Sequence, residues 1–341
     1  MFKQVVIATP LITTLFGCSP PLPETNSEQF SLVEKDLVQY VNPLMGTDST
    51  FALSNGNTYP AIATPWAMNF WTPMTAPMGD GWTYKYDDNK IRGIKQTHQP
   101  SPWLNDYGAF SFMAITGELQ FNEDDRASWY SHKAEQASPD HYSVYLADYD
   151  ITAEVTPTER AAQFRFTFPD SDNAFILLDA FNKGSMVKII PEERKIIGYA
   201  KNNHGGVPDN FHNYFVAEFD TPFSLTHTWH DDWQLKPDSL QSEGEHVGAI
   251  IGFSTQKGEQ INVKVASSFI SLEQAELNLK REIGKDSFEQ TRQKANASWQ
   301  KELSRIQVQD TNLEQVRTFY SALYRVLLFP RKFYEYDGNN N

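Results

Sequence analysis

The chain contains one cysteine, Cys18, so no disulfide can form within its 341 residues. Its 29 lysines and arginines against 43 aspartates and glutamates leave a net charge of −14, and the sequence contains no basic run. This balance argues against nucleic acid or an anionic membrane surface as a partner, because both attract clustered lysine and arginine. A neutral ligand such as a glycan is compatible with it.

Several catalytic motifs are also missing. Neither a G-x-G-x-x-G loop nor a Walker sequence is present to hold a phosphate, and no G-x-S-x-G elbow supports a serine hydrolase. The single cysteine lies in the N-terminal leader, which excludes thiol catalysis. The acidic run at 123–125 lacks the alternating ligands and the glycine of a calcium loop, so we interpret it as a solvated turn.

The N-terminal apolar run at 5–16 follows Lys3 and is too short to cross a bilayer. It predicts a signal peptide over residues 1–18. The tetrapeptide L-F-G-C resembles a bacterial lipoprotein box, in which Cys18 would be acylated; the alternative is an ordinary secreted protein with an incidental cysteine. Residues 19–36 are polar and proline-rich and predict a flexible tether. We expect an exported envelope protein, an outer-membrane lipoprotein or a periplasmic one, that meets the membrane only through a lipid on Cys18.

From about residue 109 to 270 the sequence has the pattern of β-structure, and we assign residues 37–270 to one domain. Apolar residues alternate at 109–120 and 163–168, and turn-rich stretches separate further candidates. Many short strands without intervening helices favour an antiparallel β-sandwich. The predicted strands are 109–120, 142–147, 151–156, 163–168, 174–180, 213–219, 222–229, 247–254 and 260–269.

Helical spacing replaces the alternation near Ser271. Ser271-x-x-Gln274 is a capping box, and the apolar residues after it predict linker helices over 271–309, with a break at Gly284. A second capping box, Thr311-x-x-Glu314, predicts an amphipathic helix that ends before Pro330. Because one isolated helix cannot bury its apolar face, we expect residues 310–341 to be the truncated start of a helical domain.

The segment T-H-Q-P-S-P-W-L-N-D-Y-G at 97–108 combines an imidazole, an indole, a carboxylate and a phenol. Pro100 and Pro102 stiffen the backbone and exclude helix, while Gly108 permits a tight exit into the following strand. An apolar sugar ring can stack on an indole while its hydroxyls bond to a charged acceptor. The segment therefore predicts a rigid sugar-binding loop. Glycoside hydrolysis also needs two carboxyl groups, and with 43 acids the spacing does not single out a pair.

Several co-linear motifs extend this interpretation: Y-V-N-P-L-M-G-T at 40–47, G-N-T-Y-P-A-I-A-T-P-W-A-M-N-F-W-T-P at 56–73, the loop at 97–108, H-Y-S-V-Y-L-A-D-Y at 141–149, G-G-V-P-D-N-F-H-N-Y-F-V at 205–216 and F-Y-S-A-L-Y-R at 319–325. Together, from about residue 40 onward, they resemble glycoside hydrolase family 92, the calcium-dependent exo-α-mannosidases. The resemblance implies a β-sandwich (a supersandwich) packed on an (α/α)6 barrel. It also implies inverting hydrolysis of terminal α-mannosides of glycans, including N-glycans, at the junction of the two.

The resemblance further implies that the catalytic acid, the base and most calcium ligands belong to the barrel, beyond the residues present here. We therefore expect no catalytic residue and no metal ligand in this chain, calcium as the cofactor of the whole enzyme, and an inactive chain on its own. The positions that match the family's substrate-binding residues are His98, Trp103 and Asp106 in the loop, and Gly46 and Thr47 in the first motif.

Each candidate also has a structural alternative. Asp106 would suit a turn cap before a strand, and His98 and Trp103 would suit buried core positions. Gly46 and Thr47 lie at an expected turn, where glycine supplies a positive φ with or without a ligand.

Other residues are interpreted structurally: Trp66, Trp71 and Trp82 as packing residues, and Arg160 and Asn210 as braces at the domain junction. The whole chain also has an alternative function, that of a stand-alone carbohydrate-binding surface lipoprotein without catalysis, with the helices as a stalk or partner dock.

Overall fold

The computed structural model describes residues 36–48, 52, 58–78, 83–100, 106–231, 233–308 and 310–339. The predicted signal peptide, its Cys18 and nearly all of the predicted tether lie outside the described residues, as do Trp82 and the sugar-stacking candidate Trp103.

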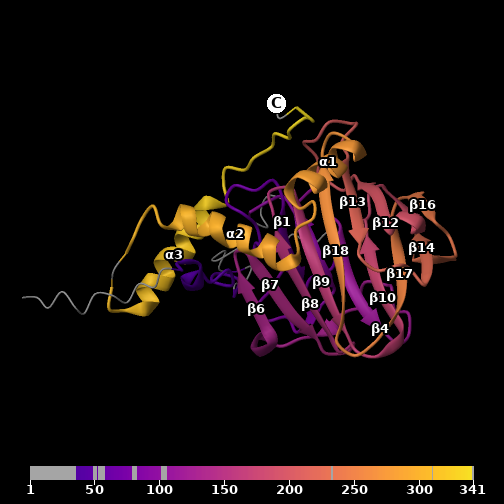
Figure 1. The fold of residues 1–341 in the computed structure, drawn as a ribbon, viewed down its shortest axis with the longest axis horizontal. Helices are drawn as coiled ribbons and strands as arrows, with labels where there is room; N and C mark the ends of the chain where they lie inside the picture. The colour runs from indigo at the N-terminus through magenta and orange to yellow at the C-terminus, as the bar shows by residue number, and fades with distance from the viewer. Residues whose placement is uncertain are drawn as a thin grey trace, which may run out of the picture.

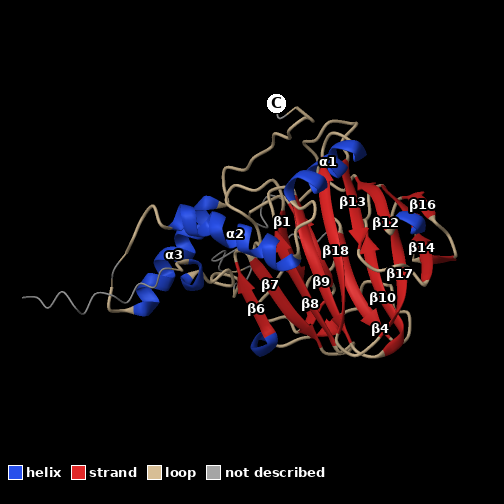
Figure 2. Ribbon diagram, in the orientation of Figure 1, coloured by secondary structure: helices blue, strands red, loops and turns tan. Residues whose placement is uncertain are grey.

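Two large sheets form most of the structure, one of seven strands and one of nine, and a separate two-stranded sheet accompanies them (Figure 2). Every pairing within them is antiparallel. The fold class predicted from the sequence, a mainly β antiparallel sandwich followed by helices, is confirmed.

The strands of the seven-stranded sheet, in pairing order, are β1 (Phe70–Met74), β3 (Gly93–Thr97), β4 (Ser111–Thr116), β10 (Ser171–Asp179), β17 (Val247–Thr255), β14 (Leu225–His230) and β15 (Gln234–Pro237). Those of the nine-stranded sheet are β16 (Gln241–Gly244), β11 (Ser185–Ile190), β12 (Lys195–Ala200), β13 (Asn213–Phe219), β18 (Glu259–Ser268), β9 (Ala161–Phe168), β8 (Ile151–Pro157), β7 (His141–Leu146) and β6 (Glu135–Ser138). The small sheet pairs β2 (Lys90–Ile91) with β5 (Ser128–Trp129), and the short 3-10 turns are η2 (Val38–Tyr40), η3 (His132–Ala134) and η4 (Pro191–Glu193).

Aromatic side chains fill the space between the two large sheets. Trp71 of β1 meets Phe164 of β9 edge-to-face, with ring centroids 5.2 Å apart, and both side chains are fully buried. Phe164, Phe166 and Phe168 point to this core, as their alternation in the sequence predicts. Edge-to-face aromatic packing adds to the burial of apolar area, so these contacts hold the sheets face to face.

Three helices follow the sandwich: α1 (Leu272–Glu282), α2 (Phe288–Leu303) and α3 (Leu313–Leu327). Ser271 caps α1 by accepting from the backbone N–H of Gln274, and Gly284, at φ 52°, separates α1 from α2, as predicted. The N-cap predicted at Thr311 is wrong by one residue: Asn312 caps α3, and its side-chain oxygen accepts from the backbone N–H of Glu314.

The helices cover one side of the nine-stranded sheet and extend past its edge. Helix α1 packs on β13 and β18, α2 packs on β8 and β9, and α3 packs on α2 and η2. Figure 1 shows α1 and α2 lying across the sheet, with α3 beyond β6 and β7. No helix in the described residues is long and apolar enough to span a bilayer.

A second core joins α2 and α3 to the segment before β1. The indole of Trp299 in α2 donates to the Ala63 carbonyl at 2.6 Å, and the Tyr324 hydroxyl in α3 donates to the Ala61 carbonyl at 2.5 Å. Tyr320 of α3 stacks on Tyr40 with ring centroids 6.0 Å apart. The middle of the predicted apolar face of α3 is therefore buried, and it packs against residues that come before β1 in the sequence.

Candidate functional site

The loop between β3 and β4 is anchored where it enters the sandwich. Gly108 has φ +61°, and its N–H donates to the Asn202 carbonyl at 2.7 Å. A β-carbon on Gly108 would lie 2.5 Å from the β-carbon of Asn213, so no larger residue fits without displacement. The tight exit that the sequence predicts at this glycine is confirmed, and it fixes the position of the two residues before it.

Asp106 uses its two carboxylate oxygens differently. Oδ1 accepts from the backbone N–H groups of His98 and Tyr107, both at 2.9 Å, and so ties residue 98 to residues 106 and 107. Oδ2 is buried, has no hydrogen-bond donor among the described residues, and lies 3.5 Å from the ammonium of Lys95. One oxygen thus caps the turn, and the other is available to a ligand.

His98 is fully buried and stacks on the ring of Tyr107, with centroids 5.2 Å apart. Its Nδ1 lies 2.7 Å from the Tyr107 carbonyl, which can only accept, so Nδ1 carries the proton. Burial is the main cause that lowers the pKa of His98, to about 4, against the opposing charge of Asp106. The neutral ring leaves Nε2 as a buried acceptor without a partner among the described residues.

Arg331 completes the group and was missed in the sequence. Its Nη2 donates to the Tyr107 hydroxyl at 3.1 Å, and the guanidinium stacks on Phe333 at 4.7 Å from the ring centroid. Its Nε and Nη1 are buried without acceptors in the described part of the chain. A cation between aromatic residues directly after the helix-ending Pro330 was the available signal. We refer to Lys95, His98, Asp106, Tyr107 and Arg331 as the loop cluster.

The loop cluster presents both unsatisfied acceptors and unsatisfied donors in one buried setting. Asp106 Oδ2 and His98 Nε2 accept, and Arg331 Nε and Nη1 donate. Buried polar atoms are nearly always hydrogen-bonded, so these four atoms give the cluster the capacity to bind a ligand. Hydroxyl groups both donate and accept, and a ligand rich in hydroxyls satisfies all four atoms, whereas an anion would leave the acceptors unpaired.

Gly46 and Thr47 form the turn that the first motif predicts. Gly46 has φ 87°, and the Thr47 hydroxyl donates to the Leu44 carbonyl at 2.8 Å. Arg325 of α3 donates to the Pro43 carbonyl at 2.5 Å and to the Tyr59 carbonyl at 2.7 Å. The Tyr59 hydroxyl in turn bonds to Thr97 and to the Gln99 carbonyl. The turn therefore reaches the loop through Arg325 and Tyr59.

A short strap, residues 331–337, carries Arg331 across the sandwich after α3. Arg160, buried at the start of β9, donates to the Tyr334 carbonyl at 2.7 Å and to Glu282 of α1 at 2.8 Å. The junction role predicted for Arg160 is confirmed by these bonds. Asn210 is exposed, and its carbonyl lies 2.8 Å from Nδ1 of His212, so the same role for Asn210 stays a prediction.

The acidic run at 123–125 is only partly the solvated turn that we predicted. Glu123 accepts from the backbone N–H of Met78 at 2.6 Å, and burial raises the pKa of its carboxyl to about 7. The nearby Arg126 is fully buried and pairs with Asp179 at 2.8 Å. Within the described ranges, no three histidine, cysteine, aspartate or glutamate residues gather into a group that could hold a metal ion.

Comparison with known proteins agrees with this architecture. The profile of the glycosyl hydrolase family 92 N-terminal domain matches residues 40–268, and that of the family's catalytic domain matches residues 274–341. An inverting mannosidase of this family from Bacteroides thetaiotaomicron is 45% identical, with a TM-score of 0.87 over 90% of this chain and 41% of that chain. A family 92 alpha-mannosidase from the same organism, solved in complex with mannoimidazole, is 32% identical, with a TM-score of 0.78 over 90% of this chain and 42% of that chain.

A more distant relative, an uncharacterized secreted glycosidase from Arthroderma benhamiae, is 22% identical over 346 residues, which cover 90% of this chain and 43% of the relative. The fold and the matches define a member of a glycoside hydrolase family, built from a β-sandwich joined to helices. The chain belongs to glycosyl hydrolase family 92, and it spans less than half the length of these relatives.

Proposed function

We propose that this chain forms the N-terminal, sugar-binding part of an inverting exo-α-mannosidase that removes terminal mannose from the α-mannosides of glycans, including N-glycans. The observation that carries the proposal is the loop cluster, in which two acceptors and two donors are buried without hydrogen-bond partners among the described residues; one of these acceptors, Asp106 Oδ2, is ion-paired with Lys95. Family membership supports mannose as the sugar, because two of the similar structures are mannosidases and one holds mannoimidazole.

Within this proposal, Asp106 Oδ2 and His98 Nε2 accept bonds from sugar hydroxyls, and Arg331 donates to hydroxyl oxygens. Trp103 supplies an aromatic face for the sugar ring, and the turn at Gly46 and Thr47 shapes the rim of the pocket. The charge-assisted bond at Asp106 is the strongest of these contacts, since ionised acceptors form shorter and stronger hydrogen bonds.

Binding and hydrolysis are separate in this chain. Inverting hydrolysis needs two carboxyl groups about 6.5–9.5 Å apart, so that a water molecule fits between one of them and the sugar. Among the described residues of the loop cluster, Asp106 is the one carboxylate. We therefore propose that the chain alone binds mannosides without cleaving them. The described residues contain no group of three histidine, cysteine, aspartate or glutamate residues that could hold a metal ion, and no step is assigned to calcium here.

The proposed location is the bacterial cell envelope, by export and acylation of Cys18. The similarity to a secreted glycosidase from Arthroderma benhamiae supports export. The alternative function, a stand-alone carbohydrate-binding lipoprotein, shares the same binding site and differs only in the absence of any hydrolytic partner.

The test is calorimetric titration of the chain with methyl α-D-mannopyranoside. We expect saturable binding that Asp106→Asn weakens at least tenfold, because the neutral amide loses a charge-assisted bond of about 1.5–3 kcal/mol. The matched control is Asp238→Asn, whose carboxylate is 94% exposed and which should leave the affinity unchanged. Equal affinity of Asp106→Asn and the unmodified chain would refute the proposal, and release of mannose from a mannobiose would refute the inactivity of the chain.

A further inference from the structure

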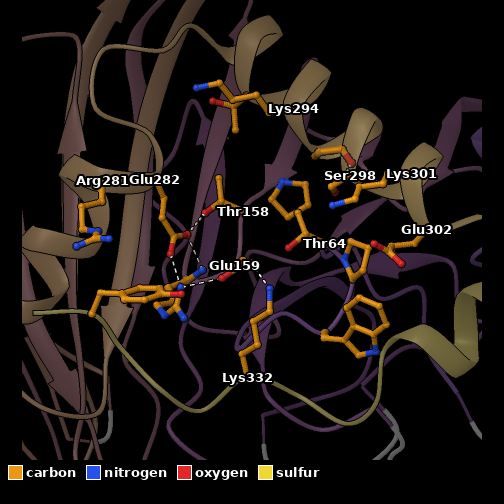
Figure 3. Close-up of a pocket in the computed structure, with 17 residues that line it drawn as sticks. Thr64, Thr158, Glu159, Arg281, Glu282, Lys294, Ser298, Lys301, Glu302 and Lys332 are labelled. Carbon is orange, nitrogen blue, oxygen red and sulfur yellow. Dashed lines mark hydrogen bonds and ion pairs between the residues drawn. The ribbon is translucent and has the colours of Figure 1, made fainter. Parts of the chain in front are cut away.

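A cavity of about 460 Å³ lies beside the strap, apart from the loop cluster, between α2, the end of α1 and the segments before β1 and β9 (Figure 3). Arg331 joins the loop cluster, whereas the next residue, Lys332, lines this cavity and pairs with Glu159. The volume lies in the range of pockets that hold small ligands, roughly 300–1,000 Å³. None of the candidate sugar-binding residues lines it.

Trp66 stands at the edge of this cavity in a strained backbone conformation. Its φ is 54°, in the left-handed region that a bulky residue rarely adopts. Two backbone bonds hold it there: its N–H donates to the Leu327 carbonyl at 2.9 Å, and its carbonyl accepts from the Lys332 N–H at 2.9 Å. Such strain persists only where the surroundings impose it, and it gathers at binding sites. Here it fixes a partly exposed indole against the cavity.

Polar groups around the cavity have capacity for further hydrogen bonds. The Thr64 hydroxyl lines the cavity, is buried with its residue 8% exposed, and has no partner among the described residues. Figure 3 shows Thr64 near the centre of the labelled side chains, with Lys301 and Glu302 of α2 to its right. Lys301 has no ion pair with any residue that the structure describes.

Charges of both signs line the cavity. Three carboxylates line it, and each is paired with a cation: Glu159 with Lys332, Glu282 with Arg160, and Glu302 with Arg305. The lining also contains five cations: Arg160, Arg281, Lys294, Lys301 and Lys332. An apolar ligand would strand these polar groups. A neutral ligand rich in hydroxyls meets both signs of charge without penalty, and its apolar ring face can lie on an indole.

We propose that this cavity is a second carbohydrate-binding site, which takes a neutral hexopyranose unit of a glycan separately from the loop cluster. The sugar ring lies on the indole of Trp66. Its hydroxyls bond to the Thr64 hydroxyl, the Lys301 ammonium and the Glu302 carboxylate. The interpretation of Trp66 as a packing residue is thereby replaced by one in which it contacts a ligand.

The test follows the indole N–H signal of Trp66 in proton–nitrogen spectra of the whole chain, identified by its absence in Trp66→Phe. Titration with methyl α-D-mannopyranoside and methyl α-D-glucopyranoside should shift this signal saturably with at least one of them. Thr64→Val and Lys301→Met, which preserve side-chain size, should each weaken that binding at least fivefold. Trp129→Phe is the matched control, since Trp129 is exposed on β5 and should leave the titration unchanged.

Asp106→Asn separates this inference from the proposed function. The Trp66 shift should persist in that variant with unchanged affinity, whether or not the loop cluster binds sugar. No shift with either sugar, or a shift that disappears in Asp106→Asn, would overturn the second site. A shift produced by sodium sulfate and not by the sugars would also overturn it, because the cavity would then bind anions. Unfolding midpoints within 2 °C of the unmodified chain, as expected for isosteric changes, show that the variants are folded.

Discussion

At the scale of single residues, the sugar-binding proposal depends on buried polar groups that are neutral or that use only part of their hydrogen-bonding capacity. His98 combines both conditions: Nδ1 is bonded to the Tyr107 carbonyl, and Nε2 is free to accept among the described residues. Protonation of Nε2 would turn that acceptor into a donor and place a charge in a buried site. The chemistry of the loop cluster is therefore tied to the neutral state of one ring.

Because of His98, the folding stability of the chain should decrease as the pH is lowered. Its pKa is lowered from 6.5 to about 4, mainly by burial, so the unfolded state binds more protons between these values and stability is lost as pH falls from 6.5 toward 4. Between pH 7 and pH 5 this costs about 2 kcal/mol. In urea unfolding at pH 7 and pH 5, the loss of unfolding free energy in His98→Asn should be smaller than that of the unmodified chain by about 2 kcal/mol. His230→Asn, at a partly exposed position of β14, should lose as much unfolding free energy between pH 7 and pH 5 as the unmodified chain. If His98→Asn also loses as much as the unmodified chain, the assignment of this pH dependence to His98 is contradicted.

Gly108 should tolerate substitution less well than another glycine with a positive φ. Gly117→Ala, at φ +86° with nothing within 4 Å, should cost only the backbone strain, about 1 kcal/mol. Gly108→Ala adds the overlap with Asn213 at 2.5 Å and should cost about 2 kcal/mol more. Because that overlap displaces Asp106, mannoside affinity should also fall in Gly108→Ala. Equal losses in the two variants, measured by urea unfolding, would show that the exit of the loop is not tight.

At the scale of elements, one carboxylate of α1 bonds to three groups at the turn before β9. Glu282 accepts from the Arg160 guanidinium at 2.8 Å, from the Arg160 backbone N–H at 2.7 Å and from the Thr158 hydroxyl at 2.5 Å (Figure 3). Arg160 also bonds to the strap, so the same pair positions the segment that delivers Arg331 to the loop cluster.

Removing the charge of Glu282 should therefore weaken both the fold and the site. Glu282→Gln breaks a pair whose side chains are 3% and 15% exposed, and we expect a loss of about 3 kcal/mol in unfolding free energy. The matched change on the same helix is Glu276→Gln, whose side chain is 48% exposed beside Lys195, and it should cost less than about 1 kcal/mol. If Glu282→Gln costs no more than Glu276→Gln, the pair does not connect the helix to the sandwich.

Whether a strand could be predicted from the sequence depends on whether one or both of its faces are buried. Strand β13 lies where its alternation predicts it, at residues 213–219. Strands β1 and β3 were not predicted, because all their residues are buried and the period of two disappears; β1 also contains Pro73. Arg331 could not be assigned to the loop from the sequence, since 224 residues separate it from Tyr107 and only the path of the strap brings them together.

At the scale of the whole molecule, net charge and exposed apolar surface have opposite effects on association between copies of the chain. The chain carries a net charge of −14, which keeps copies apart at low ionic strength. The end of α3 and the residues after it expose large apolar side chains, including Val326 at 66% and Phe329 at 60%. Exposed apolar patches of this kind favour association once charge repulsion is screened.

The chain should therefore self-associate as salt is added. In sedimentation experiments at neutral pH, the monomer fraction should fall when sodium chloride is raised from low to about 0.5 M, because the Debye length shortens below about 10 Å. The double variant Val326→Ser/Phe329→Ser should remain monomeric at the higher concentration, whereas Leu240→Ser, an exposed apolar position on the far side of the sandwich, should behave like the unmodified chain. Association that does not depend on salt or on these two residues would contradict this account.

The most direct measurement is a crystal structure of this chain with mannoimidazole, the ligand present in a similar family member. We expect the ligand in the loop cluster, with a hydroxyl within hydrogen-bond distance of Asp106 Oδ2 and another near the Arg331 guanidinium. Well-ordered crystals at saturating ligand in which Asp106 Oδ2, His98 Nε2 and Arg331 remain unliganded would contradict the account.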